Sequence, residues 1–570
     1  MSTESAVEVV ALGLPDSGAV SSGAAGAQVT VYGHPYISDR PVRGALDVGG
    51  LLADPATFVK SLDGEFVVVI ESAEKLVLIS DRYVSRPVFY SKNTEKFAFS
   101  FSYSNMWDWL RSSNLLRPSK YAFYEFLKFQ RLFGDKTLDE SSRMLAPASV
   151  LTLSKGSGEV AIDRYWAPDF EKRSSSIKEV ASDLAAAVKQ SIKVKSIGFD
   201  NVSLLLSGGM DSRVVLGGFD RNSMPNAITI GSSQNNEVSV ARELAELSNA
   251  SHHFTERSAT HYEDIFERAT AVGGSMYSYQ HGHFFGLDMP IESSLLLHGH
   301  GFDYMFQGMY LPSRRRSFLG RSTRSYELIR PSQIADEYFD SAKYQLKGID
   351  PSSLLRDAEA SGAEESVRSS IRSIAGEVEG RAVEPYDVWD YLTFGWPGRH
   401  YTYLNLLSAD TMAHQQTVAW DNSIYDLFHS TPATIRFGTG LLAETIRELR
   451  PELLNVRNAN TNMSPELSGR ALTLAGWRRG LLRRLGLGGG SSLDPDPGNR
   501  SWPSIGGQIR SSNLLSDRVR ALGDSEFLDD LALFDMSKIG VLAREFESGS
   551  AGSGAGLATL LTIDQFLRRD

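Results

Sequence analysis

The residues with the clearest chemical potential form a short turn of small and polar side chains. The turn follows the apolar run 202–206, precedes a predicted helix and has the sequence Ser207-Gly208-Gly209-Met210-Asp211-Ser212. Glycines let the backbone approach an anion closely, and serine hydroxyls and free amides at a helix start donate to phosphate oxygens. Because the Asp211 carboxylate repels phosphate unless a cation lies between them, the turn predicts a phosphate site with Mg²⁺. The alternative is a glycine turn that binds nothing.

Strand-turn-helix units give this turn its position. Strand-like apolar runs occur at 202–206, 226–231 and 293–299, and helical patterns occur at 176–194 and 237–249. Continuously apolar strands that alternate with helices predict an α/β domain with a doubly wound parallel sheet. Ligands of such sheets bind beyond the carboxyl ends of the strands, which is where the turn lies.

An earlier part of the chain has a different pattern. Short β-branched or aromatic runs separated by turn-sized gaps occur at 29–33, 65–70, 75–80, 87–91, 97–102 and 149–154. They predict an antiparallel sheet structure with a helix or two, so the fold class is α+β followed by α/β.

These patterns divide the chain. We expect a flexible N-terminal arm at 1–27, a first domain at 28–170 and a second domain at 171–570. Within the second domain, a polar helical insertion is expected at about 311–380, because this stretch is polar and helix-biased. The Gly-, Ser-, Pro- and Asp-rich stretch at about 486–504 predicts a flexible loop.

Composition narrows the function classes. Lys and Arg number 58 and Asp and Glu number 69, which leaves a net charge of −11 and argues against nucleic acid as a partner. The sequence has no cysteine, so disulfides, thiolate metal sites and cysteine nucleophiles are excluded. No apolar run approaches the roughly 18 residues of a membrane span, and we expect a soluble, cytoplasmic protein.

The glycine-rich turn matches the SGGxDS pyrophosphate loop of the ATP pyrophosphatases, and later segments resemble the asparagine synthetase family. Residues 298–308 resemble its SGEGxDElFgGY signature, and the segment 446–465 resembles the stretch after its last substrate helices. In the first domain, 63–66, 81–90, 97–100 and Tyr165-Trp166 resemble its glutaminase-type domain. The resemblance covers nearly the whole chain and implies a glutaminase-like, Ntn-type β-sandwich followed by an ATP-pyrophosphatase domain with a helical extension.

The resemblance implies roles for particular residues. Members cleave ATP between its α and β phosphates and form an acyl-adenylate that a nitrogen nucleophile attacks. By resemblance, Asp211 and Asp303 are the Mg²⁺ ligands, and Asp211, Asp303, His300 and Arg457 are the catalytic candidates. The expected ATP contacts are Leu206, Ser207, Gly208, Gly209, Asp211, Ser212, Ile230, Gly299 and His300.

Three differences from the family pattern limit which residue roles can be carried over to this chain. The family's glutaminase uses an N-terminal cysteine, whereas this chain begins Met1-Ser2-Thr3 and has no cysteine, so we expect no glutaminase activity of its own. The glutamate of SGEGxDE is replaced by His300, which either accepts a proton from an amine, contacts adenosine or merely packs. The family's late lysine is replaced by Asn460 or Ala459; Arg457 either supplies that charge or is a solvated arginine.

The resulting hypothesis is an enzyme, an asparagine synthase-like ATP-dependent carbon–nitrogen ligase. Its partners would be a small-molecule or peptide carboxylate and ammonia or an amine, and the resemblance is compatible with a homodimer. One alternative is a specialised natural-product, peptide or sugar-acid amidoligase or cyclase, similar to β-lactam synthetases and lasso-peptide cyclases. The other is a catalytically degenerate nucleotide-binding scaffold.

Overall fold

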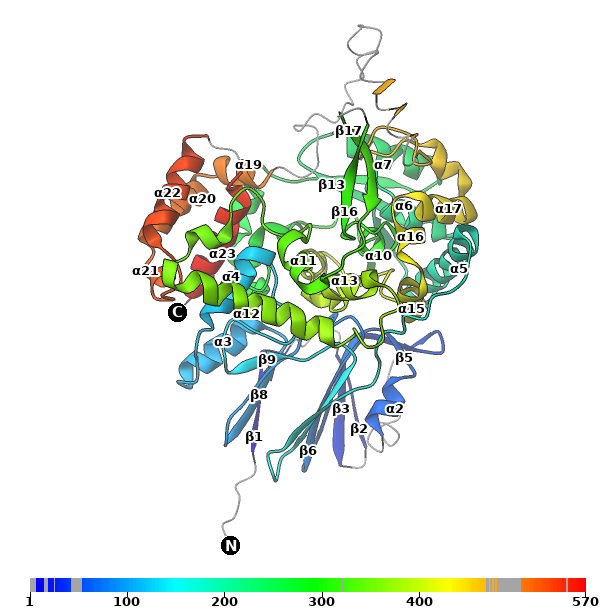
Figure 1. The fold of residues 1–570 in the computed structure, drawn as a ribbon. Coiled ribbons are helices and arrows are strands. Elements are labelled where there is room, and N and C mark those ends of the chain that lie inside the picture. Colours follow the sequence, from blue (N-terminus) through cyan, green and yellow to red (C-terminus); the bar gives the residue numbers. More distant parts are fainter. Residues whose placement is uncertain are drawn as a thin grey trace.

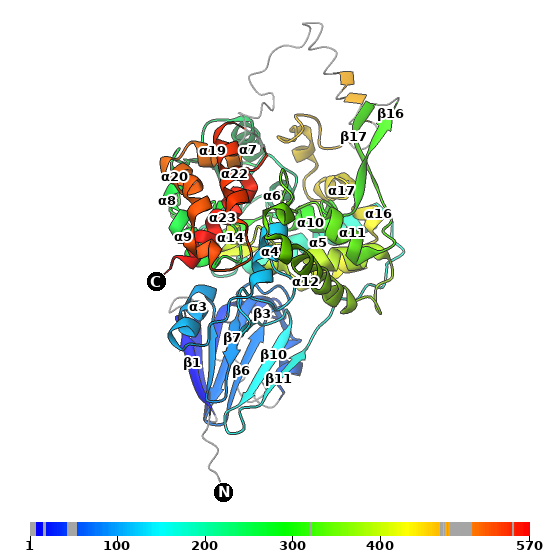
Figure 2. The same ribbon diagram turned by 60° about the vertical axis from the view of Figure 1, so that its left-hand side comes forward.

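The computed structural model describes residues 7–14, 19–24, 26–42, 54–318, 321–467, 471, 474–475, 477–478, 504–549 and 552–569. Two sheets built from the first part of the chain lie at the bottom of Figures 1 and 2, and the later elements of the chain lie above them. The four-stranded sheet has the order β1 (Glu8–Leu12), β8 (Lys96–Ser100), β7 (Phe89–Lys92), β9 (Ser142–Met144). The larger sheet has the order β11 (Val160–Arg164), β10 (Ser149–Ser154), β6 (Lys75–Ser80), β5 (Leu62–Ser72), β3 (Ala27–Ile37), β2 (Ala19–Ala24), with β4 (Arg40–Pro41) beside β3.

Strand β5 explains how these sheets pack. Successive side chains of a strand point to opposite faces, so alternate valines enter different clusters. Val67 and Val69 join Phe97 and Phe99 between the two sheets. Val68 joins a cluster on the other face of the larger sheet, beside α2 (Pro55–Val59). Both faces of β5 are therefore buried.

The expectation of a loose arm at 1–27 is wrong for two segments. Strand β1 pairs in parallel with β8, and β2 pairs antiparallel with β3. Strand β1 has the short apolar sequence EVVAL, and β2 has the small-residue sequence AVSSGA. Neither segment shows its partner locally, because the order of both comes from backbone hydrogen bonds to other strands.

The second sheet is parallel and has five strands. Its order is β14 (His252–Glu256), β13 (Asn226–Gly231), β12 (Val202–Leu205), β15 (Leu295–His298), β18 (Gln415–Thr417). The chain starts at β12, adds β13 and β14 on one side, and then places β15 and β18 on the other side. This reversal makes a topological switch point between β12 and β15, where ligands of such sheets bind. A mixed α/β fold with a parallel sheet is confirmed, whereas the domain boundary at 170/171 stays a prediction.

Helices connect and flank the parallel strands. They are α5 (Ile177–Lys195), α6 (Asp211–Gly218), α7 (Asn236–Leu247), α8 (His261–Asp264), α9 (Phe266–Gly273), η1 (Tyr279–His281) and α10 (Phe302–Phe306). Between β8 and β9 lie α3 (Tyr103–Ser112) and α4 (Lys120–Phe129).

The prediction of a helical insertion is wrong in its first part. Strands β16 (Ser313–Phe318) and β17 (Arg321–Leu328) form an antiparallel hairpin near the top of Figure 1. The register places Arg314 opposite Glu327, and their side chains form a 2.5 Å ion pair. Such cross-strand pairs stabilise a hairpin, but composition alone does not reveal them. Helices follow as expected, namely α11 (Ile334–Ser341), η2 (Pro351–Leu354) and α12 (Asp357–Gly376).

The last part of the chain is largely helical. After α12 come α13 (Pro385–Phe394), η3 (Pro397–Arg399), α14 (Leu404–Ala409), α15 (Asn422–Ser430), α16 (Ala433–Arg436), α17 (Gly440–Leu449) and η4 (Pro451–Asn455). A final group gathers above α3 in Figures 1 and 2: α19 (Ile505–Arg510), α20 (Asn513–Ala521), η5 (Leu522–Asp524), α21 (Glu526–Asp529), α22 (Met536–Glu547) and α23 (Gly554–Leu567). Residues 486–503 of the predicted flexible loop lie outside the described residues. In the described part of the chain, no helix combines the length and apolar character that crossing a membrane requires.

Candidate active site

A cavity of about 270 Å³ opens at the carboxyl ends of β12, β13 and β15. This is the switch point of the parallel sheet, so the topology itself creates the crevice. The cavity is lined by Leu205, Leu206, Ser207, Asp211, Ser212, Ile228, Thr229, Ile230, Glu237, Phe284, His298, Gly299, His300, Asp303, Tyr304, Asn405, Leu406 and Ala409.

The glycine-rich turn is closed by its own serines. Ser212 Oγ accepts a hydrogen bond from the Ser207 amide at 3.0 Å and donates to the Ser207 carbonyl at 3.1 Å. The Gly209 amide donates to Ser207 Oγ at 3.3 Å. Helix α6 begins at Asp211, so its first amides face the turn, and such amides suit an anion.

The segment expected to carry a lysine packs directly on this turn. The Ala459 amide donates to the Gly208 carbonyl at 3.0 Å, and a Cβ added at Gly208 would lie 2.3 Å from Ala459 Cβ. A Cβ added at Gly209 would lie 4.0 Å from Asn460 Nδ2. Both residues proposed for the lysine slot therefore contact the turn, and Gly208 has no room for a side chain.

The structure does not bring Arg457 together with the other predicted site residues. Its Nη1 lies 3.2 Å from Glu243 Oε2, and its Nε donates to Asn462 Oδ1 at 3.3 Å. Arg457 is not among the residues that line the cavity, and neither a lysine nor an arginine is among them. The positive charge that a polyphosphate needs must then come from outside this lining.

Asp211 and Asp303 face the cavity from the two sides of the switch point. Asp211 Oδ1 accepts from Gln307 Nε2 at 2.9 Å, and Asp303 Oδ1 accepts from the Tyr304 amide at 2.9 Å. Burial raises the pKa of Asp211 to about 7. Burial, reinforced by the charge of Asp211, raises the pKa of Asp303 well above its usual range.

Two mutually repelling carboxylates in a lining without a cationic side chain suit Mg²⁺, which binds few protein carboxylates and keeps water or phosphate as its other ligands. No cluster of three or more His, Cys, Asp or Glu side chains placed to hold a metal occurs in the described ranges. The donor set therefore fits an ion that a nucleotide brings with it, rather than one held by the protein alone.

Uncharged polar groups occupy one end of the cavity, which is formed by His298, His300 and Asn405 and is called the inner end. His298 Nε2 lies 2.6 Å from Gln415 Oε1 on β18. Burial lowers the pKa of His298 to about 4 and that of His300 to about 3, so both imidazoles are neutral at neutral pH. His298 Nδ1, His300 Nε2 and Asn405 Oδ1 are buried without a hydrogen-bond partner among the described residues. Buried polar atoms of this kind are expected to bind water or a ligand.

Gly299 holds the two ends of the cavity together. A Cβ at this position would lie 2.6 Å from the Asp211 carbonyl carbon and 2.7 Å from the Ser212 amide nitrogen. The turn after β12 and the turn after β15 therefore touch through their backbones, and glycine alone allows this approach.

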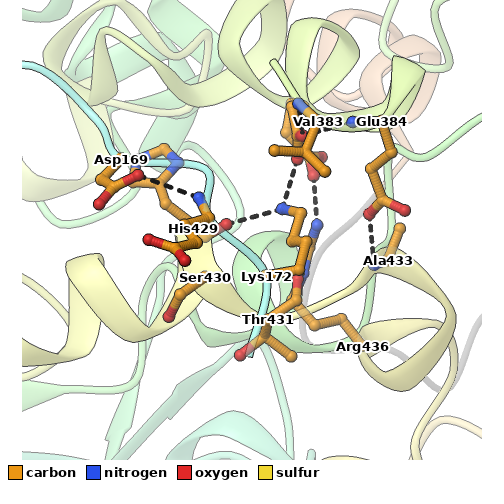
Figure 3. A network of polar contacts seen from close by, with 12 residues as sticks. Asp169, Lys172, Val383, Glu384, His429, Ser430, Thr431, Ala433 and Arg436 are labelled. Atoms are coloured by element: carbon orange, nitrogen blue, oxygen red, sulfur yellow. Dashed lines mark hydrogen bonds and ion pairs between the residues drawn. The ribbon is translucent and has the colours of Figure 1, made fainter. Parts of the chain in front are cut away.

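Figure 3 shows a polar network around Lys172, and Arg436 of this network contacts the helix that carries Asp303. Lys172, which follows β11, donates to Asp387 Oδ1 at 2.5 Å and to the His429 carbonyl at 2.7 Å. Close by, Arg436 pairs with Asp390 at 2.6 Å, and its Nη1 donates to the Met305 carbonyl on α10 at 3.0 Å. The link between the first sheets and the later helices thus also supports one wall of the site.

The first sheets reach the back of the cavity at β18. Glu65 Oε1 accepts from the Thr417 amide at 2.6 Å, and Lys195 Nζ donates to the Trp420 carbonyl at 3.0 Å. The Trp420 ring lies between Tyr83 and Tyr403, each stacked at a centroid distance of 5.7 Å. Burial raises the pKa of Glu65 to about 7. Glu65 lies outside the cavity lining but completes the hydrogen bonding of a strand at its edge.

The structure gathers most predicted site residues in one place. Leu206, Ser207, Asp211, Ser212, Ile230, Gly299, His300 and Asp303 line the cavity, and Gly208 and Gly209 lie in the turn beside it. Phe284 and Asn405 also line the cavity, although they lie in no motif and were not predicted. Thr229, whose Oγ1 donates to the Leu206 carbonyl at 2.8 Å, was also missed although it precedes Ile230.

No curated protein matches the chain. One similar solved structure is a glutamine phosphoribosylpyrophosphate amidotransferase from B. subtilis complexed with ADP and GMP, with 9% identity, a TM-score of 0.17, and coverage of 48% of this chain and 56% of that chain. Another is described as the allosteric regulatory enzyme of purine biosynthesis, with 8% identity, a TM-score of 0.18, and coverage of 49% and 56%. The similarity thus spans little more than half of each of those chains.

The family comparison concerns the parallel-sheet part. Residues 183–415 match the family model described as asparagine synthase. Every residue that lines the cavity falls within this range. The resemblance inferred from the two glycine-rich motifs is confirmed over residues 183–415, which match the asparagine synthase family model.

Proposed function

We propose that this protein activates a carboxylate with ATP and passes the acyl group to ammonia or an amine. The observation that carries the proposal is the meeting of the closed serine-glycine turn with Asp211 and Asp303 at the switch point of the parallel sheet. The apolar walls of the cavity, which include Ile228, Ile230 and Leu406, suit an adenine ring, and the turn suits phosphates.

In the proposed reaction, a carboxylate oxygen attacks the α phosphorus of ATP, and pyrophosphate leaves. The turn amides and serine hydroxyls hold the departing phosphates. Asp211 and Asp303 would hold Mg²⁺, which supplies positive charge against the polyphosphate. His300, neutral in its buried position, is placed to accept the proton that the amine loses when it attacks the acyl carbon.

The proposed reaction includes no glutamine hydrolysis by the chain itself, because the sequence holds no cysteine. Ammonia or an amine-bearing substrate would supply the nitrogen directly. The first sheets then act through contacts, such as that of Glu65 with the Thr417 amide at 2.6 Å, rather than through catalysis.

A specialised amidoligase is the second candidate, and one observation favours it. Aspartate carries an α-carboxylate that an enzyme usually pairs with a cationic side chain, and the cavity lining has no lysine or arginine. A carboxylic acid without a second anionic group would bind this lining at a lower electrostatic cost.

The test is ATP–pyrophosphate exchange by the purified full chain with Mg²⁺. Aspartate with ammonia is assayed first, and a panel of uncharged, aromatic and peptide carboxylic acids follows. Exchange with aspartate would identify an asparagine synthetase activity, and exchange with another acid would identify a specialised ligase. ATP binding without exchange for any acid would favour the nucleotide-binding scaffold and reject the ligase.

A variant pair shows whether the exchange comes from this cavity. Asp211→Asn keeps the shape but removes the charge, and we expect exchange to fall by at least about 100-fold. The control is Asp183→Asn, because Asp183 is exposed and forms an ion pair with Arg173 at 3.2 Å, away from the cavity lining. Equal exchange in the two variants would place the activity elsewhere.

A further inference from the structure

A second histidine, His400, lies just behind the inner end of the cavity. It follows η3 directly and is fully buried. Its ring centroid lies 4.3 Å from that of Tyr304 and 6.4 Å from that of His300, two residues that line the cavity. His400 is not itself among the residues that line the cavity and belongs to no motif, but its ring packs directly against two residues that do line it.

Hydrogen bonds to Thr402 determine where the proton of His400 resides. The Thr402 amide donates to His400 Nδ1 at 3.4 Å, and Thr402 Oγ1 lies 2.8 Å from the same nitrogen. Tyr304 OH lies 3.0 Å from Thr402 Oγ1 and can donate to it, which frees the threonine hydroxyl to donate to Nδ1. A backbone amide can only donate, so Nδ1 is an acceptor. The proton of the neutral ring is then on Nε2.

The ring stays neutral because of its surroundings. Burial, followed by the nearby His300, Arg131 and His281, lowers the pKa of His400 well below its usual range. Aromatic rings enclose the imidazole, with centroids at 4.7 Å for Tyr401, 5.4 Å for Tyr310 and 5.8 Å for Phe394. The hydroxyls of Tyr310 and Tyr401 lie 2.9 Å apart and bond to each other.

His400 Nε2 itself is a buried nitrogen without a hydrogen-bond partner among the described residues. An N–H donor left in this condition lowers stability unless a ligand or water accepts its hydrogen. His300 Nε2 is likewise buried without a hydrogen-bond partner among the described residues. With ring centroids 6.4 Å apart, the two nitrogens can flank one small polar group, since each hydrogen bond spans about 3 Å.

We propose that His400 donates its Nε2 hydrogen to the acyl oxygen of the activated carboxylate and so acts as an oxyanion donor. This inference rests on the proposed function and adds a residue to its acyl-transfer step. A neutral imidazole can do this work, because a donor that points at developing negative charge needs no charge of its own. The His400 hydrogen bond would stabilise the negative charge on the acyl oxygen at a site whose lining offers no lysine or arginine.

The amine lone pair forms the new carbon–nitrogen bond, and the carbonyl π electrons move to the acyl oxygen, which accepts the His400 hydrogen bond. Collapse of this adduct re-forms the carbonyl and breaks the carbon–oxygen bond to AMP, which leaves with that electron pair. One amine proton passes to His300 and then to water.

Two substitutions separate the donor from the packing. His400→Phe keeps an aromatic ring but has no donor, whereas His400→Gln can place an amide N–H near the position of Nε2. ATP–pyrophosphate exchange reports adenylation, and amide formation with hydroxylamine as the amine probe reports acyl transfer, using an acid that supports exchange. We expect His400→Phe to slow amide formation by about 100- to 1,000-fold, with exchange within about tenfold. His400→Gln should restore amide formation to within about tenfold.

Two outcomes would overturn the inference. One is unchanged amide formation in His400→Phe while exchange is also unchanged. The other is an equal loss of both reactions in both variants, which would mean that His400 only supports packing. If no acid supports exchange in the unmodified protein, the proposed function fails first, and the acyl-transfer role of His400 fails with it.

A spectroscopic measurement tests the donor without any substrate. In protein labelled with ¹⁵N-histidine, the His400 signals are assigned by their loss in His400→Gln. We expect a neutral ring with its proton on Nε2, unchanged between about pH 6 and pH 8. A proton on Nδ1 or a charged ring would overturn the inference even if the enzyme is an active ligase.

Discussion

The two ends of the cavity are built in different ways. The turn end is one continuous hexapeptide whose serines bond to its own backbone, as in the 3.0 Å bond from the Ser207 amide to Ser212 Oγ. The inner end is assembled from side chains far apart in sequence, among them His300 and Asn405, with His400 packed behind His300. Its polar atoms include several without partners among the described residues. A self-contained turn can recur in many proteins, whereas an assembled end can be matched to one substrate.

This difference separates the two half-reactions of the proposed ligase. Adenylation depends on the turn end, where phosphates bind, and acyl transfer depends on the inner end, where an amine attacks. Substitutions at one end should then affect one half-reaction, unless they act on the contact that joins the ends.

The largest effect is expected from Gly299→Ala, because it acts on that contact. Its Cβ would lie 2.6 Å from the carbonyl carbon of Asp211, so the backbone of the turn must move. A shift of about 1 Å in such a site costs about 100-fold, and we expect at least this loss in pyrophosphate exchange and in amide formation alike. Overpacking should also lower the free energy of unfolding by about 1–3 kcal/mol. Both kinetic assays and a denaturant titration check this result.

Gly156→Ala is the matched control, since a Cβ at Gly156 meets nothing within 4 Å. Its exchange rate and stability should stay close to those of the unmodified protein. A Gly299→Ala protein that lost only one half-reaction would show that the two turns move independently.

The second-largest effect is expected from His300→Gln, which should slow acyl transfer but leave adenylation intact. Burial lowers the pKa of His300 to about 3, so the imidazole is unprotonated near neutral pH and can accept a proton. Amide formation should fall by about 100-fold while exchange is retained. Because the ring gains a proton only in acid, its titration should cause no inflection in the amide-formation rate between about pH 5 and pH 8. His253→Gln, on the edge strand β14, is the control, and equal rates in the two variants would remove His300 from the reaction.

A third prediction concerns Glu65, which supports the inner end from behind. Its pKa is raised to about 7 by burial against the opposing effect of Lys195, with Asp81 and Arg86 also nearby. A raised folded-state pKa means that its contribution to stability is complete below the ordinary value of 4.5 and is lost as the pH rises through 7. Between about pH 4.5 and pH 8, the unmodified protein should lose about 3 kcal/mol more than Glu65→Gln.

Denaturant titrations of both proteins at several pH values measure this difference. If the free energy of unfolding changed with pH in the same way in both proteins, Glu65 would be ionised in the folded protein over the whole pH range tested. Pyrophosphate exchange should respond less than amide formation, because β18 borders the inner end and not the turn.

The smallest effect is expected for Arg457→Gln. The guanidinium forms a surface ion pair with Glu243 at 3.2 Å, and such pairs contribute about 1 kcal/mol or less. Exchange should change by no more than about twofold. Glu243→Gln, which breaks the same pair from the other side, should behave alike. A 100-fold loss of exchange confined to Arg457→Gln would show that this arginine turns toward the phosphates after all.

The same contrast explains what the sequence could predict. The turn and the parallel strands have local signals, an apolar run followed by glycine and serine, so Ser207, Asp211 and Gly299 were found from sequence alone. Asn405 and His400 have no local signal, because the tertiary packing of α14 and η3 brings Asn405 to the cavity and His400 against His300, which lines it. Arg457 was chosen for its charge, but the direction of a long side chain depends on a partner on another helix.

The wrong predictions about the fold have a related cause. The hairpin β16–β17 and strands β1 and β2 gain their order from pairing with other segments. The hairpin is rich in polar residues, β2 in small residues, and β1 is only a short apolar run. None of these compositions identifies a strand, since strand pairing depends on the register between strands more than on the residue types within one of them.

The stacking of Trp420 between Tyr83 and Tyr403 has a consequence for engineering. Tyr83 comes from the first sheets, and the tryptophan follows β18. A protein shortened to its parallel-sheet part would expose one face of this indole to water and leave the Thr417 amide without its acceptor. The catalytic half is therefore not a transferable module, and swaps of substrate specificity between relatives should exchange both halves together.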